Sequence, residues 1–309
     1  MPRPTISYED NHVFEFTPGM EPAYSARSGE TLTIETIDGL SGAIQTNDDL
    51  LEAMPEEVNA ATGPIEVRAV TPGDVLKIEI EDVRITEEYG RVLTTPGFGL
   101  LHDEESIDHP FTRIIPIKGD TVVFEGIEVD IRPVIGTIGV APAEESYTTL
   151  VPHDHGGNLD TTDMTAGTTA YFPVFQDGAM LAMGDSKAVM ADGEMCGTGA
   201  EISTEIDITV DVIEDPPIPV RRPLVETDKF WKTIASARTV ERAAKLANYD
   251  MLGPLERQHD FETAEAYLFS SLVGGLEVSQ VVDPLVTVRN AIPKEYLSNP
   301  FQCRRRRIA

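Results

Sequence analysis

"VLKIEIEDVRI", residues 75 to 85, alternates apolar side chains with polar or acidic ones, which is typical of a β-strand with one buried face. The same alternation recurs at 31–38, 121–131 and 202–213. A glycine beside an acidic residue precedes each of the first three segments in chain order, and this pairing favours a tight turn. We therefore expect a β-rich body of short strands from residue 10 to about 213.

The pattern changes at "EDPPIPVRRP" (214–223), where four prolines prevent a central strand or a helix from continuing. Beyond it, 239–256 and 260–275 carry apolar residues at helical spacing, and a Gly-Gly pair ends the second segment. The apolar run 276–283 predicts a strand that returns to the sheet. The sequence thus predicts an α+β fold with three parts: a β-rich body (1–215), a helical subdomain packed on it (216–300), and a disordered basic tail (301–309).

Charge limits the classes of partner. The 309 residues include 53 acidic and 24 basic ones, a formal net charge of -29. Nucleic acid and anionic membranes are therefore excluded as partners, because both need a basic surface. The excess of acids, with only 7 lysines against 17 arginines, favours a halophilic source, whereas an ordinary acidic protein is the alternative. No apolar run reaches the roughly 18 residues of a membrane span, and the two cysteines lack a pairing motif, so we expect a cytoplasmic protein.

One candidate site is the stretch "HDHGGNLD", residues 153 to 160. Imidazole and carboxylate groups are common ligands of a catalytic divalent metal, and a glycine pair lets the backbone approach a small ligand. The residues concerned are His153, His155, Gly156, Gly157, Asn158 and Asp160. The same composition also suits a polar surface turn, so this stretch alone does not establish a site.

A second candidate is "GDSKAVMADGE", residues 184 to 194. Asp185 and Lys187 lie on one face if the segment is extended, and so do Asp192 and Glu194. Carboxylates paired with an amine are suited to holding a metal or to transferring protons. The alternative is a surface hairpin whose acids are solvated.

The two stretches, read together as "HGGNLDTTDMTAGTTAYFPVFQDGAMLAMGDSKAVMADGEMCGTGAEI", resemble the acetamidase/formamidase family of metal-associated amidohydrolases. Further segments at 63–83, 135–145 and 266–297 resemble the family in the same order. The chain departs from the family pattern where Lys187 replaces a histidine. A protonated lysine cannot ligate a metal, which leaves three interpretations. Lys187 is a neutral base, or its charge replaces the metal ion, or His153 ligates the metal in place of the missing histidine.

The resemblance implies a hydrolase of short aliphatic amides such as formamide or acetamide. In that reading a divalent metal, zinc or else calcium or manganese, activates the attacking water. The implied metal ligands come from His155, Asp160, Asp185, Glu194 and His153. Glu194 or Asp192 would transfer the proton, Lys187 would serve as a catalytic amine, and Asn158 or the Gly156 and Gly157 amides would bind the oxyanion. Asp38 is expected to line the substrate pocket.

Other functions and assemblies stay open on the sequence. A non-catalytic β-protein that binds a small ligand on the same scaffold is one alternative, and a related C–N bond hydrolase is another. A cysteine mechanism through Cys196 is disfavoured, because its neighbours Lys187 and Glu194 crowd onto one segment. Strand edges that need protection and the apolar stretch 266–276 predict a homodimer or a larger even-numbered oligomer.

Overall fold

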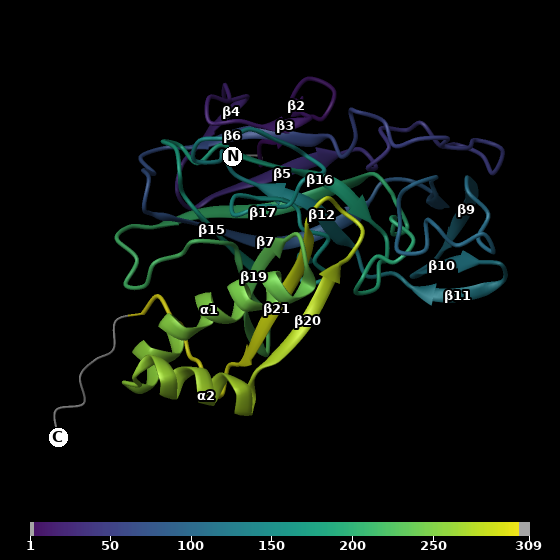
Figure 1. Cartoon of the computed structure of the whole chain (residues 1–309). Helices are drawn as coiled ribbons and strands as arrows, with labels where there is room; N and C mark the ends of the chain where they lie inside the picture. The colour runs from purple at the N-terminus through teal and green to yellow at the C-terminus, as the bar shows by residue number, and fades with distance from the viewer. Residues whose placement is uncertain (1–2, 303–309) are drawn as a thin grey trace.

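Two large β-sheets form the body of the molecule in the computed structural model, which describes residues 3–302 (Figure 1). Within those residues the larger sheet has nine strands. In spatial order they are β1 (Thr5–Ile6), β5 (Glu30–Thr36), β17 (Thr204–Ile213), β7 (Val75–Ile85), β15 (Thr169–Pro173), β18 (Leu224–Glu226), β19 (Phe230–Ala237), β21 (Val286–Pro293) and β20 (Gly275–Gln280). The β20 strand therefore forms one edge of this sheet.

The second large sheet carries several of the candidate site residues, on β14 (Gly156–Asn158) and β16 (Leu181–Lys187). Its strands are β14, β12 (Val134–Gly139), β16, β6 (Ala61–Val67) and β2 (His12–Val13), with β4 (Tyr24–Ala26) also paired to β6. A smaller sheet contains β11 (Ile127–Asp130), β10 (Thr121–Phe124), β9 (Phe111–Lys118) and β8 (Tyr89–Thr94), and β13 (Tyr147–Thr148) pairs with β3 (Glu15–Phe16).

The main hydrophobic core joins the two large sheets. Every second residue of β7 and β17 is buried in it, as the alternating sequence predicts; these are Leu76, Ile78, Ile80, Ile206, Ile208 and Val210. The second sheet contributes Ile65, Ile135 and Leu181 to the same cluster. Each such side chain stabilises the fold by about 1.5–3 kcal/mol when fully buried, so the core fixes how the sheets pack.

The predicted strands over 31–38, 75–85 and 202–213 are confirmed as β5, β7 and β17. The single strand expected over 121–131 is wrong: β10 and β11 form a hairpin there. Its turn residues Glu125 and Gly126 have φ values of 48° and 86°. That left-handed geometry is the one a two-residue hairpin turn requires, and it reverses the chain where the alternation alone predicts continuation.

Two helices cover one face of the C-terminal strands within residues 3–302 (Figure 1). The first is α1 (Val240–His259), whose cap residue Thr239 accepts a hydrogen bond from the Arg242 amide, and the second is α2 (Thr263–Val273). The β-rich α+β fold is therefore confirmed. The division at residue 215 stays a prediction. Beyond it, β18 to β21 all belong to the nine-stranded sheet, whereas the sequence predicted one returning strand.

The end of the chain is partly described. Phe301 stacks on Tyr171, with 4.8 Å between the ring centroids. Residues 303–309, which include Cys303 and most of the predicted basic tail, lie outside the described residues. Within residues 3–302, neither helix is long and apolar enough to cross a bilayer.

Candidate active site

The centre of the candidate site is the ammonium group of Lys187, the last residue of β16. Its side chain is only 2% exposed. The Nζ atom donates to Asp160 Oδ1 at 2.6 Å and to Asp185 Oδ2 at 2.5 Å. Asp185 lies on β16 and Asp160 lies in the loop after β14. Two carboxylates that are distant in sequence therefore share one buried cation.

Three more buried carboxyl groups surround this ion pair. Glu194 Oε1 lies 3.6 Å and Glu201 Oε1 3.9 Å from Lys187 Nζ. Asp283, in the segment between β20 and β21, accepts a hydrogen bond at 3.0 Å from the side-chain amide of Asn158. The Oδ1 atom of that amide accepts from the Thr137 hydroxyl at 2.8 Å, so both ends of Asn158 are fixed.

Burial shifts the protonation of these groups. Burial raises the pKa of Asp185 to about 6 against the opposing charge of Lys187. Burial, reinforced by the charge of Asp160, raises the pKa of both Glu194 and Asp283 well above the ordinary values, and burial likewise raises the pKa of Glu201. Burial alone would lower the pKa of Lys187, but the surrounding carboxylates outweigh it and raise this pKa well above its usual value. The cluster therefore combines an ammonium with carboxyl groups that keep their protons to a higher pH than usual.

The backbone around the cluster is strained and closely packed. Asp160, Asp185 and Glu194 have positive φ values of 41°, 55° and 43°. Such conformations cost about 1–3 kcal/mol each for residues other than glycine, and they concentrate at functional sites. A Cβ atom at Gly136 would collide with Lys187 Nζ and with carboxylate oxygens of Asp185 and Asp160, so only glycine allows β12 to lie against the ion pair.

A small cavity opens beside the cluster. Its volume is about 20 Å³, which is enough for about one or two water molecules. Its polar wall includes Asn158, Asp185, Lys187, Glu194, Glu201 and Asp283, and its apolar wall includes Leu40, Met54, Phe98 and Leu150. A ligand that fits there without movement of the loops has only a few atoms.

The two histidines of the motif belong to a different environment. His155 is 1% exposed and stacks on Tyr147, with 5.1 Å between the ring centroids, and Tyr147 also stacks on His153 at 4.5 Å. Burial, followed by the charge of His153, lowers the pKa of His155 to about 3, so its ring is neutral. No hydrogen bond or ion pair within residues 3–302 joins either histidine to the Lys187 cluster.

Other predicted site residues also point elsewhere. Asp192 pairs with Arg289 at 2.5 Å, and Glu194 rather than Asp192 lines the cavity. The Asp38 carboxylate accepts from the amides of Leu40 and Gly42 and pairs with Arg91 at 3.1 Å, so it shapes the loop that carries Leu40 to the cavity wall.

The glycine pair packs within the sheet. The Gly156 amide donates to His153 O at 3.1 Å, so it is already bonded. Gly156 and Gly157, with φ values of 106° and 88°, lie against β12 in register with Gly139 and Ile138. A Cβ atom on Gly156 would collide with the Ile138 carbonyl, which explains the need for glycine there.

The predicted zinc ligands are not brought together as one set. His153 and His155 lie in the aromatic cluster, while the Lys187 ammonium occupies the position between Asp160 and Asp185. A protonated amine has no lone pair and repels a dication, so these residues do not fit a zinc ion between the two carboxylates. Within residues 3–302, no group of three or more His, Cys, Asp or Glu side chains is arranged to hold a metal. A divalent metal stays a prediction from the sequence.

The sequence patterns did not single out Asp283, Thr137 or Glu201 as site residues. Asp283 lies 125 residues from Asn158 along the chain, and the two meet where the connection between β20 and β21 of the nine-stranded sheet reaches β14 of the second sheet. A signal was available: Asp283 ends the apolar run 276–283 and precedes a proline, inside a segment that resembles the family.

Comparison with known proteins identifies relatives of this chain. The family model for the acetamidase/formamidase family matches residues 3–148 and 143–233. An acetamidase from Bacillus halodurans is 39% identical, with a TM-score of 0.89 over 94% of this chain and 98% of that one. A predicted acetamidase/formamidase from Thermoanaerobacter tengcongensis is 38% identical, with the same TM-score over 95% and 98%. The formamidase of Methylophilus methylotrophus is 26% identical over 247 residues, and the match spans 61% of each protein.

Proposed function

Because the chain belongs to the acetamidase/formamidase family, we propose that it hydrolyses a short linear amide to a carboxylate and ammonia. The observation that carries this proposal is the buried Lys187 ammonium at the wall of a cavity of about 20 Å³. The formamidase and acetamidase names of its relatives support the same chemistry. The cavity size favours formamide or acetamide over longer amides.

Lys187 has one weakly bonded hydrogen to offer a substrate. Its hydrogen bonds to the carboxylates of Asp160 and Asp185 are short, whereas its third hydrogen bond, to the Asp185 carbonyl oxygen, is long at 3.4 Å. The third hydrogen is therefore suited to the carbonyl oxygen of an amide in the cavity. The Asn158 amide group, with one N–H committed to Asp283, has a second N–H for the same oxygen. Two such donors stabilise the negative charge that develops on that oxygen during attack.

The carboxyl groups supply a base and an acid. Asp185, whose pKa lies at about 6, is ionised at neutral pH and accepts a proton from the attacking water as the oxygen bonds to the carbonyl carbon. Glu194, whose pKa is raised well above its usual value, serves as the acid and gives its proton to the nitrogen as the C–N bond breaks. The products are the carboxylic acid and ammonia, and a proton moved from Asp185 to Glu194 restores the site.

Besides the amide substrate, three further features of the proposed function rest on the sequence alone. The zinc, calcium or manganese ion is one, and elemental analysis of protein purified without chelators tests it. The cytoplasmic location and the even-numbered homo-oligomer are the others. A non-catalytic binding protein on this scaffold is the competing function, and an absence of ammonia release from every amide would favour it.

The decisive experiment measures ammonia release from formamide, acetamide, propionamide and butyramide. We expect activity that falls as the acyl chain grows, since the cavity admits few atoms. The Glu194→Gln variant keeps the shape but removes the acid, and general acid catalysis is typically worth 10²–10⁴-fold. Glu128→Gln, at the exposed β11 strand, is the matched control and should behave as the wild type. Equal rates for Glu194→Gln and wild type would exclude the proposed acid.

A further inference from the structure

The apolar part of the cavity lining at Lys187 includes the aromatic residue Phe98. Phe98 lies in the turn that follows β8, and it is only partly buried, so it separates the cavity from solvent. An amide that directs its carbonyl oxygen to Lys187 and Asn158 leaves its acyl carbons to the apolar part of the lining. The size of the side chain at residue 98 therefore bears on the length of acyl chain that fits.

The backbone and the ring of Phe98 are both held in place. The Phe98 amide donates to Thr95 O at 3.1 Å, and the Leu100 amide donates to Met195 O at 2.8 Å. A Cβ atom on Gly197 would collide with the Phe98 ring, so the ring lies directly against this glycine. These contacts fix the ring as part of the cavity wall, and it limits the space inside.

Phe98 differs from two other apolar residues of the same lining. Leu40 is buried in a cluster with Ile44 and Leu93, so it supports the fold as well as the cavity. Met54 is unbranched, and a methionine side chain adapts its shape to a neighbouring group. Phe98 combines a rigid ring with partial exposure. Of the three side chains, it is the one whose truncation enlarges the cavity without opening a buried cluster.

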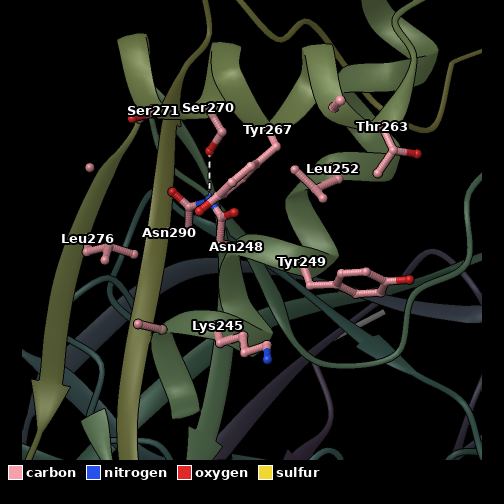
Figure 2. Close-up of a pocket in the computed structure, with 14 residues that line it drawn as sticks. Lys245, Asn248, Tyr249, Leu252, Thr263, Tyr267, Ser270, Ser271, Leu276 and Asn290 are labelled. Atoms are coloured by element: carbon pink, nitrogen blue, oxygen red, sulfur yellow. Dashed lines mark hydrogen bonds between the residues drawn. The ribbon is translucent and has the colours of Figure 1, made fainter. Parts of the chain in front are cut away.

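A second, larger hollow of the molecule does not add to this space. A groove of about 900 Å³ runs between α1, α2 and β20, and Figure 2 shows Tyr249 and Tyr267 among its lining residues. None of the described residues that line this groove also lines the cavity at Lys187. The space for an acyl chain at Lys187 therefore comes from the small cavity alone.

We propose that Phe98 sets the upper limit on the acyl chain that the cavity at Lys187 accepts, an inference that rests on the proposed function. Acetamide places one methyl group beyond the carbonyl carbon, whereas butyramide places a propyl group there. A cavity of about 20 Å³ has no room for a propyl group while the ring is in place. One methylene group more or less in a hydrophobic pocket changes kcat/KM by about 10–200-fold, so one ring is enough to decide between these substrates.

Ammonia release from acetamide and butyramide by the wild type, Phe98→Leu and Phe98→Ala tests the proposal. The ratio of kcat/KM for butyramide to that for acetamide should rise at least about tenfold in Phe98→Ala. Phe98→Leu removes less volume and should raise the ratio by a smaller factor. Phe124→Ala is the matched control, because Phe124 is 41% exposed on β10 and does not line the cavity; its ratio should equal that of the wild type.

Circular dichroism shows whether each variant is folded, and Phe98→Leu provides the comparison if Phe98→Ala does not fold. A folded Phe98→Ala protein with the wild-type ratio would overturn the proposal. A wild type that hydrolyses butyramide as fast as acetamide would overturn it as well.

Binding distinguishes a failure of this inference from a failure of the proposed reaction. A wild type that releases no ammonia from any amide refutes the reaction, and NMR titration of the same proteins with butyramide then decides the size limit. Butyramide should bind Phe98→Ala at least about tenfold more tightly than it binds the wild type. Equal affinities, or no binding to Phe98→Ala, would overturn the role of the ring.

Discussion

Lys187→Met is the most direct perturbation of the site, because methionine keeps the unbranched side chain as far as the ε position and removes the charged group. Lys187 is nearly fully buried between Asp160 and Asp185. Removing one partner of a buried pair typically costs about 3–5 kcal/mol, since the remaining charge is left uncompensated. The lost donor to the carbonyl oxygen should lower kcat by about 10²–10³-fold as well.

The loss of stability should depend on pH in a defined direction. The pKa of Asp185 in the fold, about 6, lies above its ordinary value of 3.8, so its stabilising contribution is present below 3.8 and is lost as the pH rises through about 6. Without the ammonium this pKa rises further. Lys187→Met should therefore be close to the wild type in acid, where the carboxyl groups are protonated, and fall furthest behind above pH 6.

Urea unfolding in molar KCl at several pH values measures the free energy difference, and ammonia release measures turnover. Lys118→Met is the matched control, because Lys118 is 73% exposed and forms an ion pair with Glu128 on the surface. A surface pair of that kind contributes 0–1 kcal/mol. A Lys187→Met protein as stable as the wild type above neutral pH, with unchanged ammonia release, would refute the central role of the ion pair.

Four further outcomes are expected. The wild-type kcat/KM should rise through about pH 6 as Asp185 ionises and fall at higher pH as Glu194 loses its proton; Glu194→Gln should remove that fall from the pH profile. Lys187→His should abolish ammonia release if the amine is catalytic, whereas tighter zinc binding by calorimetry with activity retained would show a displaced ligand. His155→Phe keeps the stacking on Tyr147, so ammonia release should persist, and its loss together with bound metal would restore the ligand prediction. The thermal midpoint should rise by at least several degrees from low to molar KCl, because salt screens the net charge of -29, and a midpoint that does not move contradicts a halophilic origin.

The sheet strands were predictable because alternation is a local property that survives folding. β7 has the predicted limits, and β17 begins two residues inside them. The error over 121–131 also has a local cause: Glu125 and Gly126 provide a hairpin turn inside a pattern that otherwise alternates. A glycine that follows an acidic residue inside an alternating stretch therefore indicates a turn.

The site was only half predictable for a reason of geometry. The stretch 153–160 looks like one cluster, yet β14 separates its ends: His155 lies in the aromatic cluster, and Asp160 lies at Lys187. Closeness in sequence therefore overstated closeness in space. Conversely, Asp283 and Asn158 meet only through the arrangement of the sheet, which no local pattern encodes.

The balance of charge at Lys187 links these observations. Five carboxyl groups face one ammonium, and full ionisation would leave a net charge of -4 in a cavity that holds about one or two waters. A divalent cation would compensate two of those charges, whereas a lysine compensates one. The remaining compensation must come from bound protons, which is why burial raises the pKa of Glu194, Glu201 and Asp283 together. In the proposed reaction the lysine therefore binds the carbonyl oxygen, whereas burial and the charge of Asp160 favour the proton on Glu194 against the opposing charge of Lys187.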